Sequence, residues 1–332
     1  MSSGRPSVRL AAVCAVAAGL AALSTPPAQA AGGTPFTFAV LGDTPYGAAD
    51  VARFPGIVDQ VNADPEVRLV AHLGDIKSGS TVCSDAYFAE VRRQLDRFED
   101  PLVYTPGDNE WTDCHRPNNG AYDPLERLDA LRSVFFDRPG HALGKQVGLT
   151  SQRKQGLPEN VTLTRAGVAL TAVHVVGSND GLLPWTGRTA PTPAQLAEQR
   201  QRSAAAVELL RRTFAQADGK RAVVLMLQAD MFFGVPDEAG SSAFRPLVQA
   251  IAEGAAGFDG PVYLLNGDTH VYERDTPLAA GSPWLSFYGL SGPVPNLTRI
   301  TVEGAAGVDE YLRATVDVHD PAVVLFERVP LR

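Results

Sequence analysis

Four aspartates occupy positions from which their side chains could meet. Each is the second residue of a Gly-Asp pair that follows an apolar run, and the four are Asp43, Asp75, Asp108 and Asp268. Glycine lets a chain turn sharply as it leaves a strand. Ligands of open α/β sheets bind beyond the carboxyl ends of the strands. If the four runs are neighbouring strands, four carboxylates converge at that edge.

Carboxylates that converge in this way favour a metal site. They repel one another and raise one another's pKa unless a cation offsets their charge, and a divalent metal ion is the simplest such cation. A single Gly-Asp pair is most often only the turn at the end of a strand. Four instances, the last one continuing into Thr269-His270, favour metal binding.

The order of these segments resembles the calcineurin-like metallophosphoesterase superfamily. That family carries the blocks D-x-H, G-D-x-x, G-N-H-D/E, a single His and G-H-x-H, in this order. The last segment, with the sequence GDTHVYER over 267–274, is also similar to the GHVHAYER block of purple acid phosphatases. The corresponding segments of this chain are GDTP at 42–45, GDIK at 74–77, GDNE at 107–110, LQAD at 227–230 and GDTH at 267–270.

Several positions depart from the family pattern. Asp43, Asp75 and His270 keep family ligands. The replacements are Pro45 for the His of the first block, Asp108 for Asn, Asn109 for the His that assists the leaving group, Gln228 for the single His, and Asp268 for the first His of the last block.

The resemblance implies one or two divalent metal ions. One cation is expected at Asp43, Asp75 and His270. A second is expected at Asp75 together with Asp108, Gln228 and Asp268. Oxygen ligands have replaced nitrogen ligands, and this change favours Mn, Mg, Fe or Ca over an all-zinc site.

The activity that the resemblance implies is hydrolysis of a small phosphate ester, by a phosphatase or phosphodiesterase that uses a metal-activated hydroxide. Asn109 could orient phosphate but cannot act as an acid. The general acid would come from Glu110, Asp113 or His115 in the same polar loop. Arg116 would hold a phosphate oxygen, or would pair with nearby acids instead.

Two other functions stay open. One is a catalytically weak or inactive relative that binds a metal or an anion and serves recognition. The other is an exported protein whose aspartates bind calcium only for structure. The net charge is −8, from 29 Lys and Arg against 37 Asp and Glu. Because a phosphate backbone is held mainly by basic side chains, this charge excludes bulk nucleic-acid binding.

The elements that must position these residues alternate between strand and helix. This alternation predicts a largely parallel sheet. Later segments, and a hairpin over 161–176 that turns at 166–167, add antiparallel strands. We therefore predict one α/β domain over 31–332 with two packed mixed sheets, and the resemblance implies a four-layer α/β/β/α sandwich. The predicted strands are 36–41, 67–73, 102–105, 223–227, 262–265, 284–290, 297–302, 311–318 and 322–329, and the predicted helices are 52–62, 85–98, 125–136 and 194–217.

The first thirty residues predict export. Two arginines precede an apolar run over 10–23, and small residues at 28–31 are typical of a cleavage site, so 1–30 is interpreted as a signal peptide of a secreted or periplasmic protein. A lipoprotein anchor at Cys14 is the less favoured interpretation of this segment. No other run is long and apolar enough to span a bilayer. Cys83 and Cys114 then remain, and in an exported protein they are expected to form a disulfide rather than two free thiols.

Other polar and aromatic residues have weaker functional signals. His174 lies in an apolar segment and is expected to be a hydrogen-bonded structural histidine, while Asn179 and Asp180 are weak site candidates. Tyr46, Trp111 and the pair at 232–233 could line a substrate pocket, although aromatic residues are more often in the core.

Overall fold

The apolar runs of the sequence form two sheets in the computed structural model, which describes residues 1–4 and 36–332. The predicted signal peptide, from residue 5 onward, and its cleavage site lie outside the described residues. Within the described part, no helix is both long and apolar enough to cross a bilayer.

The first sheet has six strands in the order β13-β12-β1-β2-β3-β4. Strands β1, β2 and β3 run parallel, and their last residues are in register, because Leu41 pairs with His72 and His72 with Tyr104. The other neighbours in this sheet are antiparallel. The strands are β1 (Phe36–Leu41), β2 (Val67–His72), β3 (Pro101–Tyr104), β4 (Leu143–Gly144), β12 (Glu310–Val316) and β13 (Val324–Pro330).

The second sheet has seven strands in the order β10-β11-β9-β8-β7-β6-β5. The four strands β7, β8, β9 and β11 run parallel, and antiparallel strands flank them on both sides. The strands are β5 (Thr150–Gln152), β6 (Leu157–Arg165), β7 (Val168–Ala172), β8 (Ala222–Met226), β9 (Val262–Asn266), β10 (Glu273–Asp275) and β11 (Leu297–Thr301).

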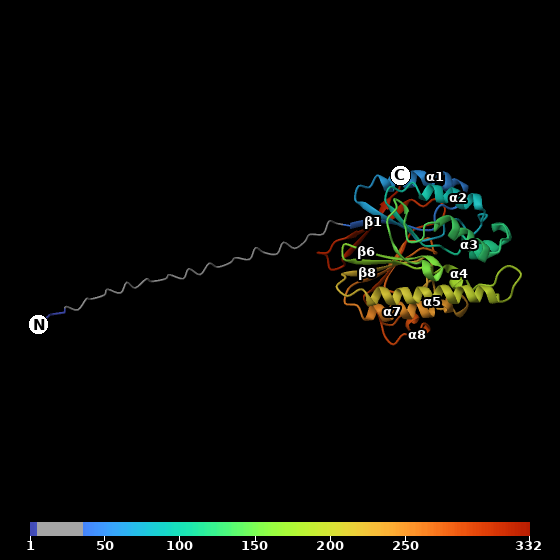
Figure 1. Cartoon of the computed structure of the whole chain (residues 1–332). Helices are drawn as coiled ribbons and strands as arrows, with labels where there is room; N and C mark the ends of the chain where they lie inside the picture. The colour runs from blue at the N-terminus through green and yellow to red at the C-terminus, as the bar shows by residue number, and fades with distance from the viewer. Residues whose placement is uncertain (5–35) are drawn as a thin grey trace. The chain divides into compact units, whose positions relative to one another are not determined.

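Helices cover the outer face of each sheet (Figure 1). Helices α1, α2 and α3 pack on the first sheet, and α5 and α7 pack on the second, while Trp284 of α8 belongs to the same apolar cluster as α5 and α7. A third apolar layer, which includes Phe38 and Leu170, lies between the two sheets. The α-helices are α1 (Gly47–Asn62), α2 (Asp85–Leu95), α3 (Pro124–Phe135), α4 (Gly177–Gly181), α5 (Pro193–Ala215), α6 (Glu238–Ser241), α7 (Arg245–Ala256) and α8 (Pro283–Phe287), and the 3₁₀ turns are η1 (Thr112–His115), η2 (Pro117–Asn119), η3 (Arg153–Gln155) and η4 (Ser242–Phe244).

The predicted fold class, an α/β/β/α sandwich of two mixed sheets, is confirmed. The hairpin that turns at 166–167 is present as β6 and β7. The predicted strand over 284–290 is wrong, because most of it forms helix α8. Pro283 occupies the first turn of that helix, and the Ser282 hydroxyl accepts the Trp284 N–H as a cap. Helix α7 was not predicted, and no side chain caps its start.

Candidate metal and ester site

The four Gly-Asp pairs lie just beyond the carboxyl ends of strands from both sheets. Asp43 follows β1, Asp75 follows β2 and Asp108 follows β3, whereas Asp268 follows β9 of the second sheet. The first three are at most 7% exposed, and Asp268 is partly buried. Three of the four, excepting Asp108, have a positive φ. The sandwich therefore brings the predicted carboxylates to one place.

Two of the glycines in these pairs are required for close packing. A Cβ at Gly107 would overlap the carboxylate of Asp75, and a Cβ at Gly267 would overlap the carboxylate of Asp43. Neither glycine has a positive φ. In these pairs, the glycine therefore leaves room for an aspartate of another strand, in addition to ending its own strand.

Asp43, Asp75 and His270 form a close group of candidate metal ligands. One ligand atom from each lies within 4.8 Å of the other two. His270 Nε2 is 3.4 Å from Asp43 Oδ1. This is the trio that the sequence predicts for the first cation. We call these three residues the acidic trio.

The Tyr46 hydroxyl lies among the three members of the acidic trio. Its oxygen is 3.3 Å from Asp43 Oδ1, 3.1 Å from Asp75 Oδ2 and 3.3 Å from His270 Nε2. Sequence reasoning treated Tyr46 only as a pocket-lining residue. The available signal was its position three residues after Asp43, directly after the first Gly-Asp block.

The electrostatics of the acidic trio fit a bound cation. Burial raises the pKa of Asp75 well above its usual value, and the nearby charges of Asp108, Glu110, Asp43 and Asp268 raise it further. Burial also raises the pKa of Asp43, and His270 opposes that shift. Two carboxylates and an imidazole, with a phenol oxygen in reach, are a suitable donor set for a divalent metal ion.

Gln228 lies between two of the carboxylates, but with its amide nitrogen toward them. The backbone N–H of Gly177 donates to Gln228 Oε1 at 2.7 Å. A backbone N–H can only donate, so this bond fixes the orientation of the amide. Its Nε2 is 3.3 Å from Asp75 Oδ2 and 3.4 Å from Asp108 Oδ1. In this arrangement Gln228 turns its amide nitrogen toward Asp75 and Asp108, and its role as an oxygen ligand of a second cation stays a prediction.

Asp108 and Asp268, the other predicted ligands of the second cation, both approach Gly177. A Cβ at Gly177 would be 2.9 Å from an oxygen of each. Asp108 Oδ2 accepts from the Ser178 hydroxyl at 2.6 Å, and Asp268 Oδ2 accepts from the Asp230 N–H at 3.0 Å. Among the described residues, neither belongs to a group of close carboxylate, histidine or cysteine ligand atoms.

Asn109 holds Asp75 in place. Its backbone N–H donates to Asp75 Oδ1 at 3.1 Å, and its side-chain amide donates to Asp75 Oδ2 at 2.7 Å. The same amide also donates to the Tyr46 hydroxyl. Asn109 thus positions a ligand, whereas the sequence predicted that it orients the phosphate.

Glu110 is fully buried behind the site. Its Oε1 accepts from the N–H groups of Asp75 and Gly107 and from the Tyr104 hydroxyl, at 3.1, 2.6 and 2.8 Å. These bonds tie the Glu110 side chain to the backbone of its own loop and of the loop that carries Asp75. The role of Glu110 as a general acid stays a prediction.

His115 and Arg116 differ in their surroundings. His115 Nδ1 is 2.9 Å from the Thr186 N–H and 2.7 Å from the Thr186 hydroxyl, and its ring stacks on Trp185. Arg116 Nη1 pairs with Asp113 Oδ2 at 2.7 Å and keeps 39% of its side chain exposed. Arg116 can thus still meet a ligand, whereas Nδ1 of His115 is already occupied.

Asp113 has the environment of a proton-carrying carboxyl. Burial raises its pKa to about 8, and the charge of Asp108 adds to the shift, while Arg116 and Lys77 oppose it. Lys77 is itself buried, which lowers its pKa to about 8. Asp113 is thus a buried carboxyl that pairs with Arg116 and whose raised pKa favours retention of its proton near neutral pH.

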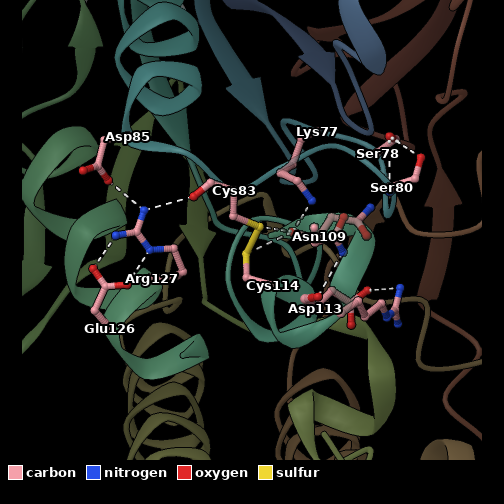
Figure 2. The surroundings of a disulfide bond; sticks show 12 residues. Lys77, Ser78, Ser80, Cys83, Asp85, Asn109, Asp113, Cys114, Glu126 and Arg127 are labelled. Carbon is pink, nitrogen blue, oxygen red and sulfur yellow. Dashed lines mark hydrogen bonds and ion pairs between the residues drawn. A yellow bond between two sulfur atoms is a disulfide. The ribbon is translucent and has the colours of Figure 1, made fainter. Parts of the chain in front are cut away.

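The predicted disulfide between Cys83 and Cys114 is confirmed (Figure 2). Cys83 lies between β2 and α2, and Cys114 lies in η1, so the bridge joins the two loops that follow Asp75 and Asp108. Both sulfur atoms lie within 3.8 Å of the Asn109 carbonyl oxygen, which also accepts from Lys77 Nζ at 2.7 Å. The bridge therefore supports the residue that holds Asp75.

His174 and Asp180 are part of the buried framework. His174 Nδ1 is 2.9 Å from Glu159 Oε1, in agreement with the structural role that the sequence favours. Asp180 pairs with the buried Arg202. Asn179 lines a cavity beside Asp108 and accepts the Ala243 N–H at 2.9 Å.

No protein-family model matches this sequence, and no curated protein matches it. Among solved structures, the fold is similar to purple acid phosphatase PPD1 from yellow lupin seeds, with 10% identity, a TM-score of 0.48, and coverage of 90% of this chain and 52% of that one. It is also similar to GAP50, the anchor in the inner membrane complex of Plasmodium, with 10% identity, a TM-score of 0.45, and coverage of 90% and 89%.

A third similar structure is the 5′-nucleotidase precursor from Thermus thermophilus, with 15% identity, a TM-score of 0.43, and coverage of 90% of this chain and 54% of that one. The matched region spans about half the length of the lupin and Thermus proteins. By its own architecture, the chain is a two-sheet α/β/β/α protein with an acidic ligand cluster at the carboxyl ends of its parallel strands.

Proposed function

We propose that this protein is an exported, cation-dependent hydrolase of small phosphoric esters. The observation that carries the proposal is the acidic trio, whose ligand atoms lie within 4.8 Å of one another at an edge shared by both sheets. When bound there, a divalent cation would lower the pKa of water and offset charge on the phosphoryl oxygens. The Cys83–Cys114 disulfide supports an oxidising compartment and therefore export.

The chain's own residues would divide the remaining tasks. Asn109 keeps both oxygens of Asp75 in fixed positions by two hydrogen bonds. Arg116 would bind a phosphate oxygen with its exposed guanidinium. Asp113, whose pKa is raised to about 8, would supply the proton to the leaving alcohol.

One cation is a better fit than two. The predicted second set has an amide N–H group of Gln228 between Asp75 and Asp108, where a cation would need an oxygen. We therefore propose a single ion at the acidic trio, with Mn, Mg, Fe or Ca preferred over zinc.

The test begins with protein stripped of metal and reloaded separately with Mn²⁺, Mg²⁺, Fe²⁺, Zn²⁺ or Ca²⁺. Each form is assayed on nitrophenyl phosphate and on bis-nitrophenyl phosphate. We expect turnover with at least one ion and its loss in Asp75→Ala, while the exposed Asp218→Asn control keeps it. Turnover that is equal in Asp75→Ala, or absent with every ion, would contradict the enzyme proposal.

The second candidate is a catalytically weak or inactive relative that binds a metal or an anion for recognition. It is favoured by two hydrogen-bond donors, the Tyr46 hydroxyl and the Gln228 amide, which already contact the carboxylates. Calorimetry separates the two candidates: one ion bound per chain without turnover supports the binding protein. Calcium binding that raises only the thermal stability would instead indicate a structural ion.

A further inference from the structure

A cavity of about 740 Å³ opens beside two of the four Gly-Asp aspartates. Asp108 and Asp268 form part of its wall, so it is continuous with the carboxyl edge of the two sheets. The segment after β8, which includes Phe233 and Val235, also lines the cavity, as does Leu183 after α4. These walls could enclose the part of an ester that lies beyond its phosphate.

Exposed apolar side chains concentrate around this cavity. Phe233 is 68% exposed and Val235 is 77% exposed, and both line it together with Leu183. Val271, which is also largely exposed, directly follows His270 of the acidic trio. Few other large apolar residues in the described part of the chain are exposed. Exposed apolar side chains that gather at one place mark a binding surface.

The position of Phe233 is set by the core beneath it. The preceding residue, Phe232, is only 4% exposed and packs edge-to-face against Trp284 and Tyr288. The Tyr288 hydroxyl also donates to the Met231 carbonyl. Two successive residues of this segment are therefore anchored in the core, which holds the Phe233 ring outward at the cavity.

The charge of the cavity has one sign. Its lining includes Asp108, Asp230, Asp237 and Asp268 but no lysine, arginine or histidine. Of these four aspartates, Asp230 alone pairs with a basic side chain in the described part of the chain, that of Arg299. The second carboxylate oxygen of Asp230, Oδ2, is buried and has no hydrogen-bond partner among the described residues. An anionic ligand would be repelled here, whereas a cationic group would be attracted.

We propose that this cavity binds the organic part of the ester, an apolar group that carries a positive charge, such as a quaternary ammonium or a protonated amine. The substrate class rests on the proposed function, because the phosphate of the same molecule would lie at the acidic trio. Phe233 offers a ring face to the cation, and the aspartates offset its charge. Nucleotides and sugar phosphates, which lack such a group, would bind less well.

The test measures binding without turnover. Metal-stripped protein is titrated by calorimetry with benzyltrimethylammonium, benzyl alcohol and benzenesulfonate at low ionic strength. We expect the ammonium compound to bind at least about tenfold more tightly than the alcohol, and the sulfonate most weakly. Equal affinities, or tighter binding of the sulfonate, would overturn the proposal.

Two variants locate the binding. Phe233→Ala and Asp237→Asn should each weaken ammonium binding about three- to tenfold. Phe233 is exposed, and asparagine can keep the cap that Asp237 gives to the Gly240 N–H, so both variants should fold. The matched control is Leu325→Ala, at an exposed apolar position on β13, and it should leave the affinity for the ammonium compound unchanged. Unchanged affinity in Phe233→Ala would place the ligand elsewhere and overturn the proposal.

The outcome separates this inference from the proposed function. Ammonium binding that depends on Phe233, in a protein that hydrolyses no nitrophenyl ester with any metal, would contradict the hydrolase and leave the cavity assignment standing. Metal-dependent hydrolysis in a protein with no preference for the ammonium compound would support the hydrolase and contradict the cavity assignment. Displacement of the ammonium compound by a divalent ion, with no effect of Phe233→Ala, would also count against the inference.

Discussion

At the scale of single residues, Asp75 is held in place by hydrogen bonds to side chains from several segments of the chain. Its oxygens accept from Asn109, Tyr46 and Gln228, and its own N–H donates to Glu110. Partners that orient a metal ligand are worth about 10–100-fold in metal affinity. The sequence marks Asp75 by its Gly-Asp pair, whereas these partners come from separate segments of the chain.

Asn109→Leu should weaken cation binding about 10–100-fold, because it removes the amide that donates to Asp75 Oδ2 at 2.7 Å. The measurement is metal affinity by calorimetry, with folding checked by circular dichroism. Asn118→Leu, at an exposed position in the same region, is the matched control. Equal affinities in the two variants would show that Asn109 does not position a ligand.

Gly267→Ala should destabilise the protein by about 1–3 kcal/mol, since its new Cβ would overlap the carboxylate of Asp43. Gly56→Ala in helix α1 is the contrasting control. A Cβ there meets no atom within 4 Å, and alanine is the better helix former, so a gain of about 0.5–1 kcal/mol is expected. Urea denaturation measures the free energy of unfolding of both variants. An unchanged stability of Gly267→Ala would contradict the close packing of Gly267 against Asp43.

At the scale of elements, the disulfide joins the segment between β2 and α2 to the 3₁₀ turn η1. It packs against the Asn109 carbonyl, and Figure 2 shows Lys77 approaching the same residue from the other loop. A covalent bridge restricts the unfolded chain, and here it also restrains the loop that holds Asp75.

Replacing both cysteines, Cys83→Ala with Cys114→Ala, should lower the free energy of unfolding by about 3–4 kcal/mol. Cation affinity should fall as well, because Asn109 loses its support. Urea denaturation and metal titration measure the two effects. A reducing agent should have a similar effect on the native protein and none on the double variant. A double variant with native cation affinity would limit the bridge to a stabilising role.

At the scale of the whole molecule, a buried ion pair links the two halves of the sandwich. Arg132 of α3, which covers the first sheet, bonds to Glu159 of β6 in the second sheet at 2.6 Å. His174 bonds to the same carboxylate. Burial acts to raise the pKa of Glu159, but His174 and Arg132 together hold it at about 2.

Glu159→Gln should remove a pH-dependent part of the stability. The carboxylate has a lower pKa in the folded protein, about 2, than its ordinary value of 4.5, so its contribution is complete above pH 4.5 and is lost as the pH falls toward 2. The linked free energy is on the order of 3 kcal/mol. Denaturation curves from neutral to acid pH should converge for native protein and variant, and a constant difference would contradict the pKa shift.

Much of the fold could be predicted from patterns along the chain. Continuous apolar runs predict β1, β8 and β9, because strands buried on both faces need no polar alternation. A hydroxyl residue followed by proline, Thr192-Pro193, is typical of a helix start and precedes α5, where the structure adds a capping box with Gln195. The apolar content of 284–290 suits either element, and in the folded chain Trp284 packs against Phe232 as part of a short helix.

The amino-acid sequence already marks the residues that could form a site. Gly-Asp pairs after apolar runs identify four aspartates, a histidine follows the last of them, and the family resemblance groups Asp43 and Asp75 with His270. The role of each neighbouring side chain depends on the folded structure. A single backbone N–H from Gly177 turns the amide nitrogen of Gln228 toward the carboxylates. Such orientations depend on contacts between distant segments, and for that reason spacing along the chain does not encode them.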